Sequence, residues 1–268
     1  MKETAMEISA IQMQVIEDNV DSAIESAVKL IRQCRGSDLI VLPELWNIGF
    51  MSFEKYLSAA DSESEKTLAA MKEMAKETGA YLHTGSFPLK TASGCYNASF
   101  LLSPTGEVLG EYRKIHLFGF NSQESDILSP GERICVIETP LGGMGLATCF
   151  DLRFPELFRQ MVDLGAEMFL VCSAWPYPRL EHWMLLTRTR AIENQCILVA
   201  ANSTGVNRGV AFVGHSMIID PWGTVLAGCG DDEAIARTRI DAGVVKDARN
   251  RFPGLASRKN WLQRGDLT

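Results

Sequence analysis

The chain has 268 residues, a hydrophobic content of 46% and a formal net charge of −7 at pH 7. This length fits one α/β layer domain with a large core, and the acidic balance without a long basic run argues against nucleic acid and anionic membranes as partners. No stretch is apolar over the length of a transmembrane helix, and the first residues lack the apolar core of a signal peptide.

Hydrophobic periodicity predicts alternating strands and helices in the first part of the chain. Apolar residues spaced as on one helix face indicate a helix over 19–34 and a second over 64–78. The strands expected there are 7–14, 38–43, 81–87, 95–102 and 107–113. The last two form a hairpin across a Pro-x-Gly turn.

The same alternation continues after a glycine- and polar-rich loop that runs to Glu132. Helices are expected from Pro155 to near Gly165 and over 180–193. The expected strands are 134–137, 145–148, 167–172, 196–201, 216–219, 224–227 and 234–240. A short helix and a polar tail, about 249–268, finish the chain. Because no linker rich in Pro, Gly or Ser divides it, we predict a single domain over 1–268.

The cysteines and histidines point away from disulfides and metal binding. Seven cysteines, an odd number, are spread along the chain without a C-x-x-C pair, and the four histidines are equally scattered. Such spacing fits neither a disulfide framework nor a zinc site. We therefore predict a reducing, cytoplasmic location and no metal.

One segment echoes another. Residues 101–110 align without gaps with 218–227, so that Pro104 and Gly106 match Pro221 and Gly223. Either hairpins simply reuse Pro-x-Gly turns, or the chain contains two similar halves, each a mixed sheet edged by a hairpin and covered by helices. The second interpretation predicts an α/β fold of four layers, an α-β-β-α sandwich of two mixed sheets with the helices outside.

Cys149 stands where an apolar run ends and a helix is expected to begin near Phe154 and Pro155. A sharp turn between a strand and a helix exposes its side chain and aims backbone N–H groups at what that side chain attacks. A helix N-terminus also favours the thiolate. Taken alone, a buried and inert cysteine explains the residue as well, because free Cys is among the most buried residue types.

Two further strand ends carry complementary chemistry. Glu44 follows the apolar run that ends at Pro43, and Lys114 follows the first hairpin. A carboxylate can take the proton of a thiol, and an ammonium with the Phe150 N–H can stabilise the oxyanion of acyl transfer. Each residue alone also fits a solvated surface charge.

The three segments together resemble the nitrilase superfamily of carbon–nitrogen hydrolases, and within it the Nit-type omega-amidases. The matching motifs are Leu42–Glu44, Tyr112–Lys114 followed by His116–Phe118, and Cys149–Glu156. The resemblance continues through Ser173-Ala-Trp-Pro, Arg190–Asn194, Asn202 and Gly214–Ser216, to about residue 245.

The resemblance implies hydrolysis of a small carboxamide to acid and ammonia through a thioester, without metal or cofactor. Glu44 would be the base, Cys149 the nucleophile, and Lys114 with the Phe150 N–H the oxyanion donors. A second glutamate of the family matches Glu124, which would orient Lys114 or the amide; Glu132 is the competing position.

Neighbouring residues are assigned from the same motifs. Arg153, Glu156 and Asp151 are expected to brace the turn, Arg153 by pairing with carboxylates. Candidate pocket walls are Trp175, Phe118 and Trp46, each with core packing as the alternative. Arg179 could meet a substrate carboxylate or lie on the surface. The other six cysteines are expected to have packing or surface roles.

The resemblance also implies a homodimer built on the helices after Cys149 and after Arg179. The first of these helices has more apolar positions than one narrow buried stripe would need, which are Leu157, Phe158, Met161, Val162 and Leu164. The alternatives to an omega-amidase are an N-carbamoyl hydrolase or a nitrilase on the same scaffold, and a non-catalytic binding protein. The sequence does not choose the physiological substrate.

Overall fold

The computed structural model describes residues 5–259, and its first half forms one mixed sheet with helices on its outer face. In chain order the elements are β1 (Ala5–Gln14), α1 (Val20–Gln33), β2 (Leu39–Val41), α3 (Ser64–Thr78), β3 (Tyr81–Thr91), β4 (Gly94–Leu102) and β5 (Val108–Arg113). β1, β2 and β3 are parallel, and the β4–β5 hairpin continues the sheet antiparallel to β3. β13 (Ala234–Asp241) pairs antiparallel with β1 at the other edge.

The second half repeats this order. Its elements are β7 (Gly142–Thr148), α5 (Pro155–Asp163), β8 (Met168–Ser173), α6 (Leu180–Asn194), β9 (Ile197–Asn207), β11 (Met217–Ile219) and β12 (Val225–Gly228). β7, β8 and β9 are parallel, and the β11–β12 hairpin follows β9 in antiparallel pairing. β6 (Val136–Thr139) pairs antiparallel with β7, in the place that β13 takes beside β1. The two halves therefore have one topology.

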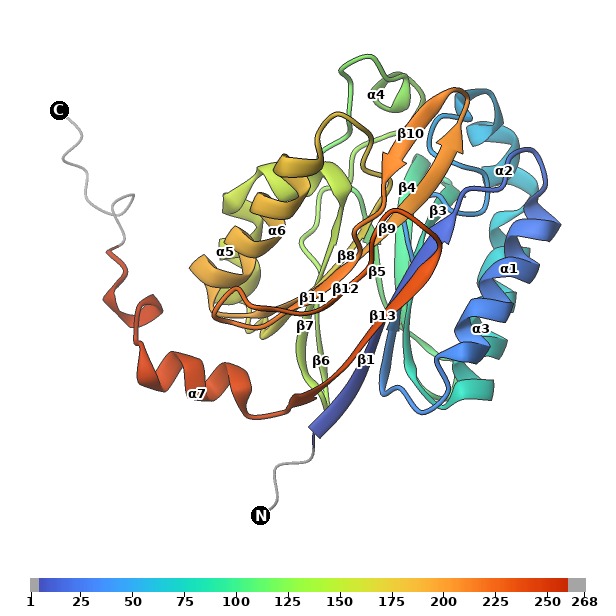
Figure 1. Ribbon diagram of the computed structural model, residues 1–268. Coiled ribbons are helices and arrows are strands. Elements are labelled where there is room, and N and C mark those ends of the chain that lie inside the picture. The colour runs from blue at the N-terminus through green and yellow to red at the C-terminus, as the bar shows by residue number, and fades with distance from the viewer. Residues whose placement is uncertain (1–4, 260–268) are drawn as a thin grey trace, which may run out of the picture.

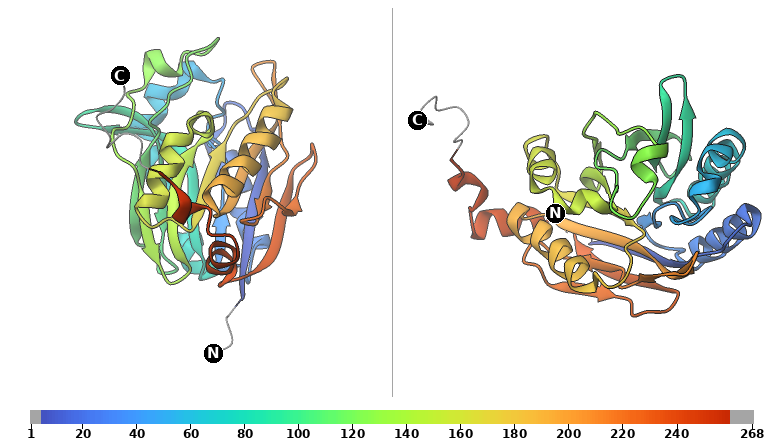
Figure 2. Two further views of the ribbon diagram at one scale, coloured as in Figure 1. Left: turned by 90° about the vertical axis from the view of Figure 1, so that its left-hand side faces the viewer. Right: turned by 90° about the horizontal axis from the view of Figure 1, so that it is seen from above.

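Three apolar cores separate four layers. One lies between the sheets and joins residues such as Ile8 and Leu39 to Met144 and Met168. The other two lie under α1 and α3 and under α5 and α6. Figure 1 shows the two helix pairs on opposite sides of the strands, and Figure 2 shows the same layers from the side and from above. The α-β-β-α sandwich predicted from the internal echo is confirmed.

The two hairpins also confirm the echo itself. Gly106 and Gly223 both adopt positive φ, +77° and +82°, which glycine accepts without steric cost. Their turns close in the same way, by Ser103 N–H to Glu107 O at 2.8 Å and Asp220 N–H to Thr224 O at 3.0 Å. The two hairpins therefore share the Pro-x-Gly sequence and also occupy corresponding positions in the two halves of the fold.

The halves are joined where β1 and β9 run past their own sheets. Met13 and Gln14 pair in parallel with Ser203 and Thr204, which makes the sheets one continuous system. β9 extends well beyond the predicted strand and pairs with β10 (Val210–Val213), which the sequence did not predict.

Short elements account for most of the other differences. The sequence did not predict η1 (Phe53–Lys55), α2 (Tyr56–Ser62) or α4 (Glu124–Ile127), and a 3₁₀ turn, η2 (Cys149–Arg153), precedes α5. α7 (Val244–Arg251) begins before the predicted tail, which also contains η3 (Leu255–Ser257); the remainder of that tail, 260–268, lies outside the described residues. Within residues 5–259, no helix has the length and apolar character needed to cross a membrane.

Candidate active site

The three predicted strand ends come together at one site, where Lys114 bonds Glu44 and both act on the Cys149 thiol. Glu44 follows β2, Lys114 follows β5, and Cys149 follows β7. Glu44 and Lys114 are fully buried, and Cys149 is 6% exposed. The Glu44 segment is positioned by a close approach of β3, because the Gly85 backbone at φ +65° leaves no room for a Cβ, which would lie 2.1 Å from Pro43 O. The convergence therefore depends on close packing between strand ends.

Lys114 lies between two buried carboxylates. Its Nζ is 2.8 Å from Glu44 Oε1 and 2.9 Å from both oxygens of Glu124. Burial alone would lower the pKa of Lys114, but Glu124 and Glu44 together raise it well above its usual range. Burial and the nearby Glu44 raise the pKa of Glu124, which Lys114 opposes. Lys114 is therefore held as a charged ammonium.

The choice between the two candidate glutamates has a geometric answer. Glu124 is buried and bonds Lys114, and its Oε2 also accepts the Phe118 N–H at 2.8 Å. Glu132 is exposed. The structure thus brings Glu124, and not Glu132, to the lysine.

The oxygens of Glu44 have different surroundings. Oε1 accepts from Lys114 Nζ at 2.8 Å and from Asn97 Nδ2 at 2.9 Å. Oε2 accepts the backbone N–H of Ala174 at 2.9 Å, so it keeps a free acceptor direction. Asn97, on β4, was not among the predicted site residues, because a single Asn within a strand carries no local signal of a site.

Cys149 occupies a strained turn. Its φ of +48° is rare for a residue with a side chain, and it places the thiol at the start of the turn η2. Burial and the carboxylate of Glu44 raise the pKa of the Cys149 thiol well above its ordinary value, although Lys114 acts in the opposite direction. The resting group is therefore a thiol, which differs from the thiolate that the turn alone suggested, because burial outweighs the helix terminus.

Asp151 links the cysteine turn to the lysine segment. Its carboxylate accepts the Thr148 N–H at 2.8 Å, as the bracing role predicted. It also accepts from Tyr112 Oη at 2.7 Å and lies 2.7 Å from His116 Nδ1, and these partners flank Lys114 in sequence. The motifs of Lys114 and Cys149 are therefore joined through one buried carboxylate.

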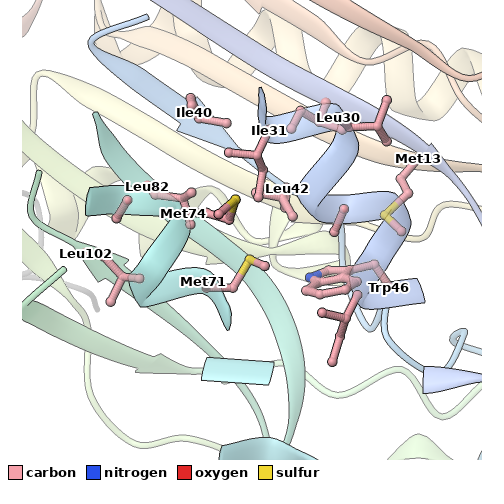
Figure 3. Close-up of a cluster of buried hydrophobic side chains, with 14 of the residues drawn as sticks. Met13, Leu30, Ile31, Ile40, Leu42, Trp46, Met71, Met74, Leu82 and Leu102 are labelled. Atoms are coloured by element: carbon pink, nitrogen blue, oxygen red, sulfur yellow. The ribbon is translucent and has the colours of Figure 1, made fainter. Parts of the chain in front are cut away.

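A pocket opens above Cys149. The predicted residues Phe118, Phe150, Trp175 and Arg179 line it. Sequence reasoning missed the other lining residues, which are Phe50, Arg153, Ala174 and Pro176. Trp46, the remaining candidate wall, lies instead in the core under α1 and α3 (Figure 3), where its Nε1 donates to Thr84 O. The core-packing alternative is correct for Trp46.

Two guanidinium groups lie at this pocket. Arg179 is 5.5 Å from the Phe118 ring centre, and Arg153 is 5.0 Å from that of Trp175. Burial and Arg179 lower the pKa of Arg153. Within residues 5–259 neither arginine forms an ion pair with a carboxylate, so the expected role of Arg153 in pairing with carboxylates is wrong; its Nη2 lies 3.1 Å from His182 Nδ1. Glu156 is exposed.

The cysteines and possible metal ligands complete the site description. All seven cysteines are free thiols, and burial raises the pKa of Cys172 and Cys196 to about 12. Across the part of the chain that the structure describes, no group of three or more His, Cys, Asp and Glu side chains is arranged to hold a metal ion. The expectation of a metal-free and cofactor-free reaction remains a prediction.

Comparisons with known proteins place the chain in a family. Residues 7–250 match the family model of carbon-nitrogen hydrolases. The chain is 35% identical to a 2-oxoglutaramate amidase of Paenarthrobacter nicotinovorans over 97% of this chain and 92% of that protein, and 34% identical to human omega-amidase NIT2 over 97% of both. A CN-hydrolase superfamily protein of Xanthomonas campestris superposes with a TM-score of 0.89 at 28% identity, covering 96% of this chain and 98% of that one. With a family match across nearly its whole length and relatives of this similarity, the chain belongs to the carbon-nitrogen hydrolase family.

Proposed function

We propose that this carbon-nitrogen hydrolase is a cysteine-dependent amidase of the omega-amidase type, which hydrolyses the terminal amide of a short dicarboxylic or 2-oxo acid. The observation that carries this proposal is a pocket with the Cys149 thiol and two guanidinium groups without carboxylate partners among the described residues. The names of the amidase relatives support the same class of substrate.

The first chemical step assigns a role to each buried group. Glu44 Oε2 accepts the thiol proton as Sγ attacks the amide carbon, because Oε1 is already occupied by Lys114 and Asn97. The tetrahedral oxyanion is stabilised by the Lys114 ammonium and the Phe150 N–H at the first turn of η2, where backbone donors lack helical partners. Glu124 holds Lys114 in place.

The second step regenerates the enzyme. Collapse of the tetrahedral intermediate breaks the C–N bond, and Glu44 gives its proton to the leaving ammonia. Water then attacks the thioester, with Glu44 taking its proton. Collapse of the second tetrahedral intermediate breaks the C–S bond, Glu44 returns the proton to Sγ, and the carboxylic acid leaves as the Cys149 thiol is restored. Glu44 thus acts twice as base and twice as acid within one cycle.

The two arginines explain the choice of an acidic substrate. Arg179 and Arg153 carry like charge at one pocket, and an anion between them would relieve their repulsion while forming charge-assisted hydrogen bonds. The aromatic walls Phe118, Phe150 and Trp175 would contact the short carbon chain.

An ammonia-release panel tests this function. Succinamate and 2-oxo-acid amides should be hydrolysed with kcat/KM at least about a hundredfold above butyramide, a neutral amide of the same length, because the arginines would lose a paired charge. Preference for carbamoyl amino acids or nitriles would assign one of the alternative chemistries. Release of no ammonia from any member would favour a binding protein.

We further propose a homodimer through α5 and α6. Leu164, Leu185 and Ile192 are exposed by 58%, 60% and 48%. Only some of the apolar residues that indicated this face are exposed. Leu157, Phe158 and Met161 are buried within the protomer core, whereas Leu164 is exposed.

Light scattering at micromolar concentration should give a dimer, and Ile192→Glu should give a monomer. Leu57→Glu, at an exposed position on α2, is the matched control. A monomeric parent protein would contradict the proposal.

A further inference from the structure

We propose that Asn97 is a positioning residue that holds the carboxylates of Glu44 and Glu124 together and aims Glu44 at the thiol; the proposal rests on the cysteine mechanism above. Asn97 is 1% exposed and lies on β4, outside all the motifs that identified the family. It does not line the pocket. Its role would therefore be exerted through the two glutamates, without contact to substrate.

The amide of Asn97 makes the same two contacts as the Lys114 ammonium. Its Nδ2 donates to Glu44 Oε1 and to Glu124 Oε1, both at 2.9 Å. Lys114 Nζ donates to the same two oxygens at 2.8 and 2.9 Å. The carboxylates are thus bridged twice, once by a charged donor and once by a neutral donor.

The orientation of this amide follows from its partners. Two carboxylate oxygens can only accept, so the NH₂ group must face them and the carbonyl must face away. The carbonyl oxygen of Asn97 is buried and has no hydrogen-bond partner among the described residues. Such an unsatisfied atom is costly, and it is tolerated here because the NH₂ group serves two buried anions.

The charge balance explains why a neutral donor is needed. Glu44, Glu124 and Lys114 are all fully buried, so two negative groups share one positive group. Hydrogen bonds to a carboxylate favour its ionised form, and Asn97 acts in this direction on Glu124. A second cation in place of Asn97 would neutralise the pair but would also draw Glu44 away from its function as a base.

Asn97 also fixes the geometry of both catalytic groups. Its backbone carbonyl accepts the Lys114 N–H at 2.9 Å, which sets where the lysine leaves β5. Its side chain and Lys114 both bind Oε1 of Glu44, while Ala174 N–H binds Oε2. Hydrogen bonds to both oxygens therefore fix the orientation of the Glu44 carboxyl group. Its remaining acceptor direction is on Oε2.

The test compares Asn97→Ala and Asn97→Asp with the parent protein. Aspartate keeps the shape of asparagine but replaces its N–H donors with acceptors, so packing alone would tolerate it. The control is Asn47→Ala, because Asn47 is equally buried and its amide bonds Thr67 and neither glutamate. Thermal unfolding of all four proteins confirms that each is folded.

The first readout needs no substrate. The rate of Cys149 alkylation by iodoacetamide, followed by peptide mass spectrometry, is measured against pH. In both Asn97 variants the acid limb should move up by about one pH unit or more, because Glu124 loses a hydrogen bond that favours its charged form. An acid limb that coincides with those of the parent and of Asn47→Ala would overturn the proposal.

The second readout is turnover of the amide that the parent hydrolyses best. Both Asn97 variants should lose about ten- to hundredfold in kcat, the range for a lost hydrogen bond to a charged group, with KM within about threefold. A loss confined to KM, or full turnover by Asn97→Asp, would contradict the proposed role. If the parent hydrolyses no amide, the proposed function fails, and the alkylation profile still decides the role of Asn97.

Discussion

The two halves of the molecule share a topology but carry different chemistry. By strand register, Leu39 on β2 corresponds to Met168 on β8, and five residues beyond each stand Glu44 and Ser173, with Glu44 N–H bonded to Ser173 O at 3.3 Å. When the alignment of the two hairpins is continued past β5 and β12, the position that corresponds to Lys114 in the second half is Asp231, which is exposed. The first half therefore supplies the buried carboxylate and ammonium, and the second half has no such groups at the same places.

The nucleophile shows the opposite asymmetry. Ile8 and Met144 correspond by register, so Met13 is the counterpart of Cys149. β1 continues straight through Met13 into its pairing with β9, whereas β7 ends at Thr148 and the chain turns at Cys149 with positive φ. The site therefore forms where β7 ends although its counterpart β1 continues. It is complete only when the first half, with Glu44 and Lys114, packs against the second half, with Cys149.

The largest expected effect comes from removing the nucleophile Cys149, which the second half supplies. Cys149→Ala should lower kcat by more than about 10⁴-fold, because no other nucleophile among residues 5–259 lines the pocket. The variant should keep its fold, since only one sulfur atom is lost. Ammonia release measures the effect, and Cys34→Ala, a fully buried thiol at the end of α1, is the control. Turnover by Cys149→Ala near the parent rate would exclude the mechanism.

Lys114→Arg tests the ammonium of the first half. Arginine keeps the charge, but its wide planar fork does not fit a site that holds Nζ within 2.9 Å of three carboxylate oxygens. We expect a loss of about 10³-fold, mainly in kcat, because the contact to the oxyanion strengthens in the transition state. Steady-state kinetics measure this loss, and Lys90→Arg, at an exposed position, is the control. A normal Lys114→Arg enzyme would remove Lys114 from the site.

Glu44→Gln tests the base of the same half. Glutamine is nearly isosteric and keeps an acceptor for Lys114, but it cannot take a proton. The rate should fall by at least about 10²-fold, the usual scale for a lost general base. Glu132→Gln, the exposed glutamate of the neighbouring loop, should retain full turnover. If Glu44→Gln stays within a few-fold of the parent, another base operates, with Glu124 the first to test.

The smallest expected effect concerns His83, whose counterpart across the halves is Val199. Burial lowers the pKa of His83 to about 3, and its Nε2 has no hydrogen-bond partner among the described residues. The unfolded chain binds a proton near pH ~6.5, so folding stability is lost as pH falls from about 6.5 towards 3.

His83→Val makes the first half resemble the second and should remove this acid sensitivity. Between pH ~6.5 and ~4.5 the parent should lose about 2–3 kcal/mol more unfolding free energy than the variant. The variant should be slightly less stable at neutral pH, because Gly85 N–H loses its acceptor on His83. Urea unfolding at both pH values measures the difference, and parallel losses in the two proteins would show that His83 is not neutral in the fold.

The sequence by itself determined the elements whose signals are local. The apolar spacing of 64–78 predicted α3 to the residue, and both Pro-x-Gly turns appeared as hairpins because a turn depends only on its own few residues. The echo between them indicated two halves and hence the four layers. The resemblance identified Glu44, Lys114 and Cys149 as residues to bring together, and the packing of the sheets does so.

Only the tertiary structure decided what depends on neighbours distant in sequence. Asn97 reaches Glu44 and Glu124 across 53 and 27 residues, and nothing beside it in the chain announces those partners. Arg153 was expected to brace the turn and instead faces the pocket beside Arg179. The protonation of Cys149 followed burial and Glu44 rather than its place at a helix start. Charge and solvation act through space, so these properties appear only when the two sheets have packed and excluded water.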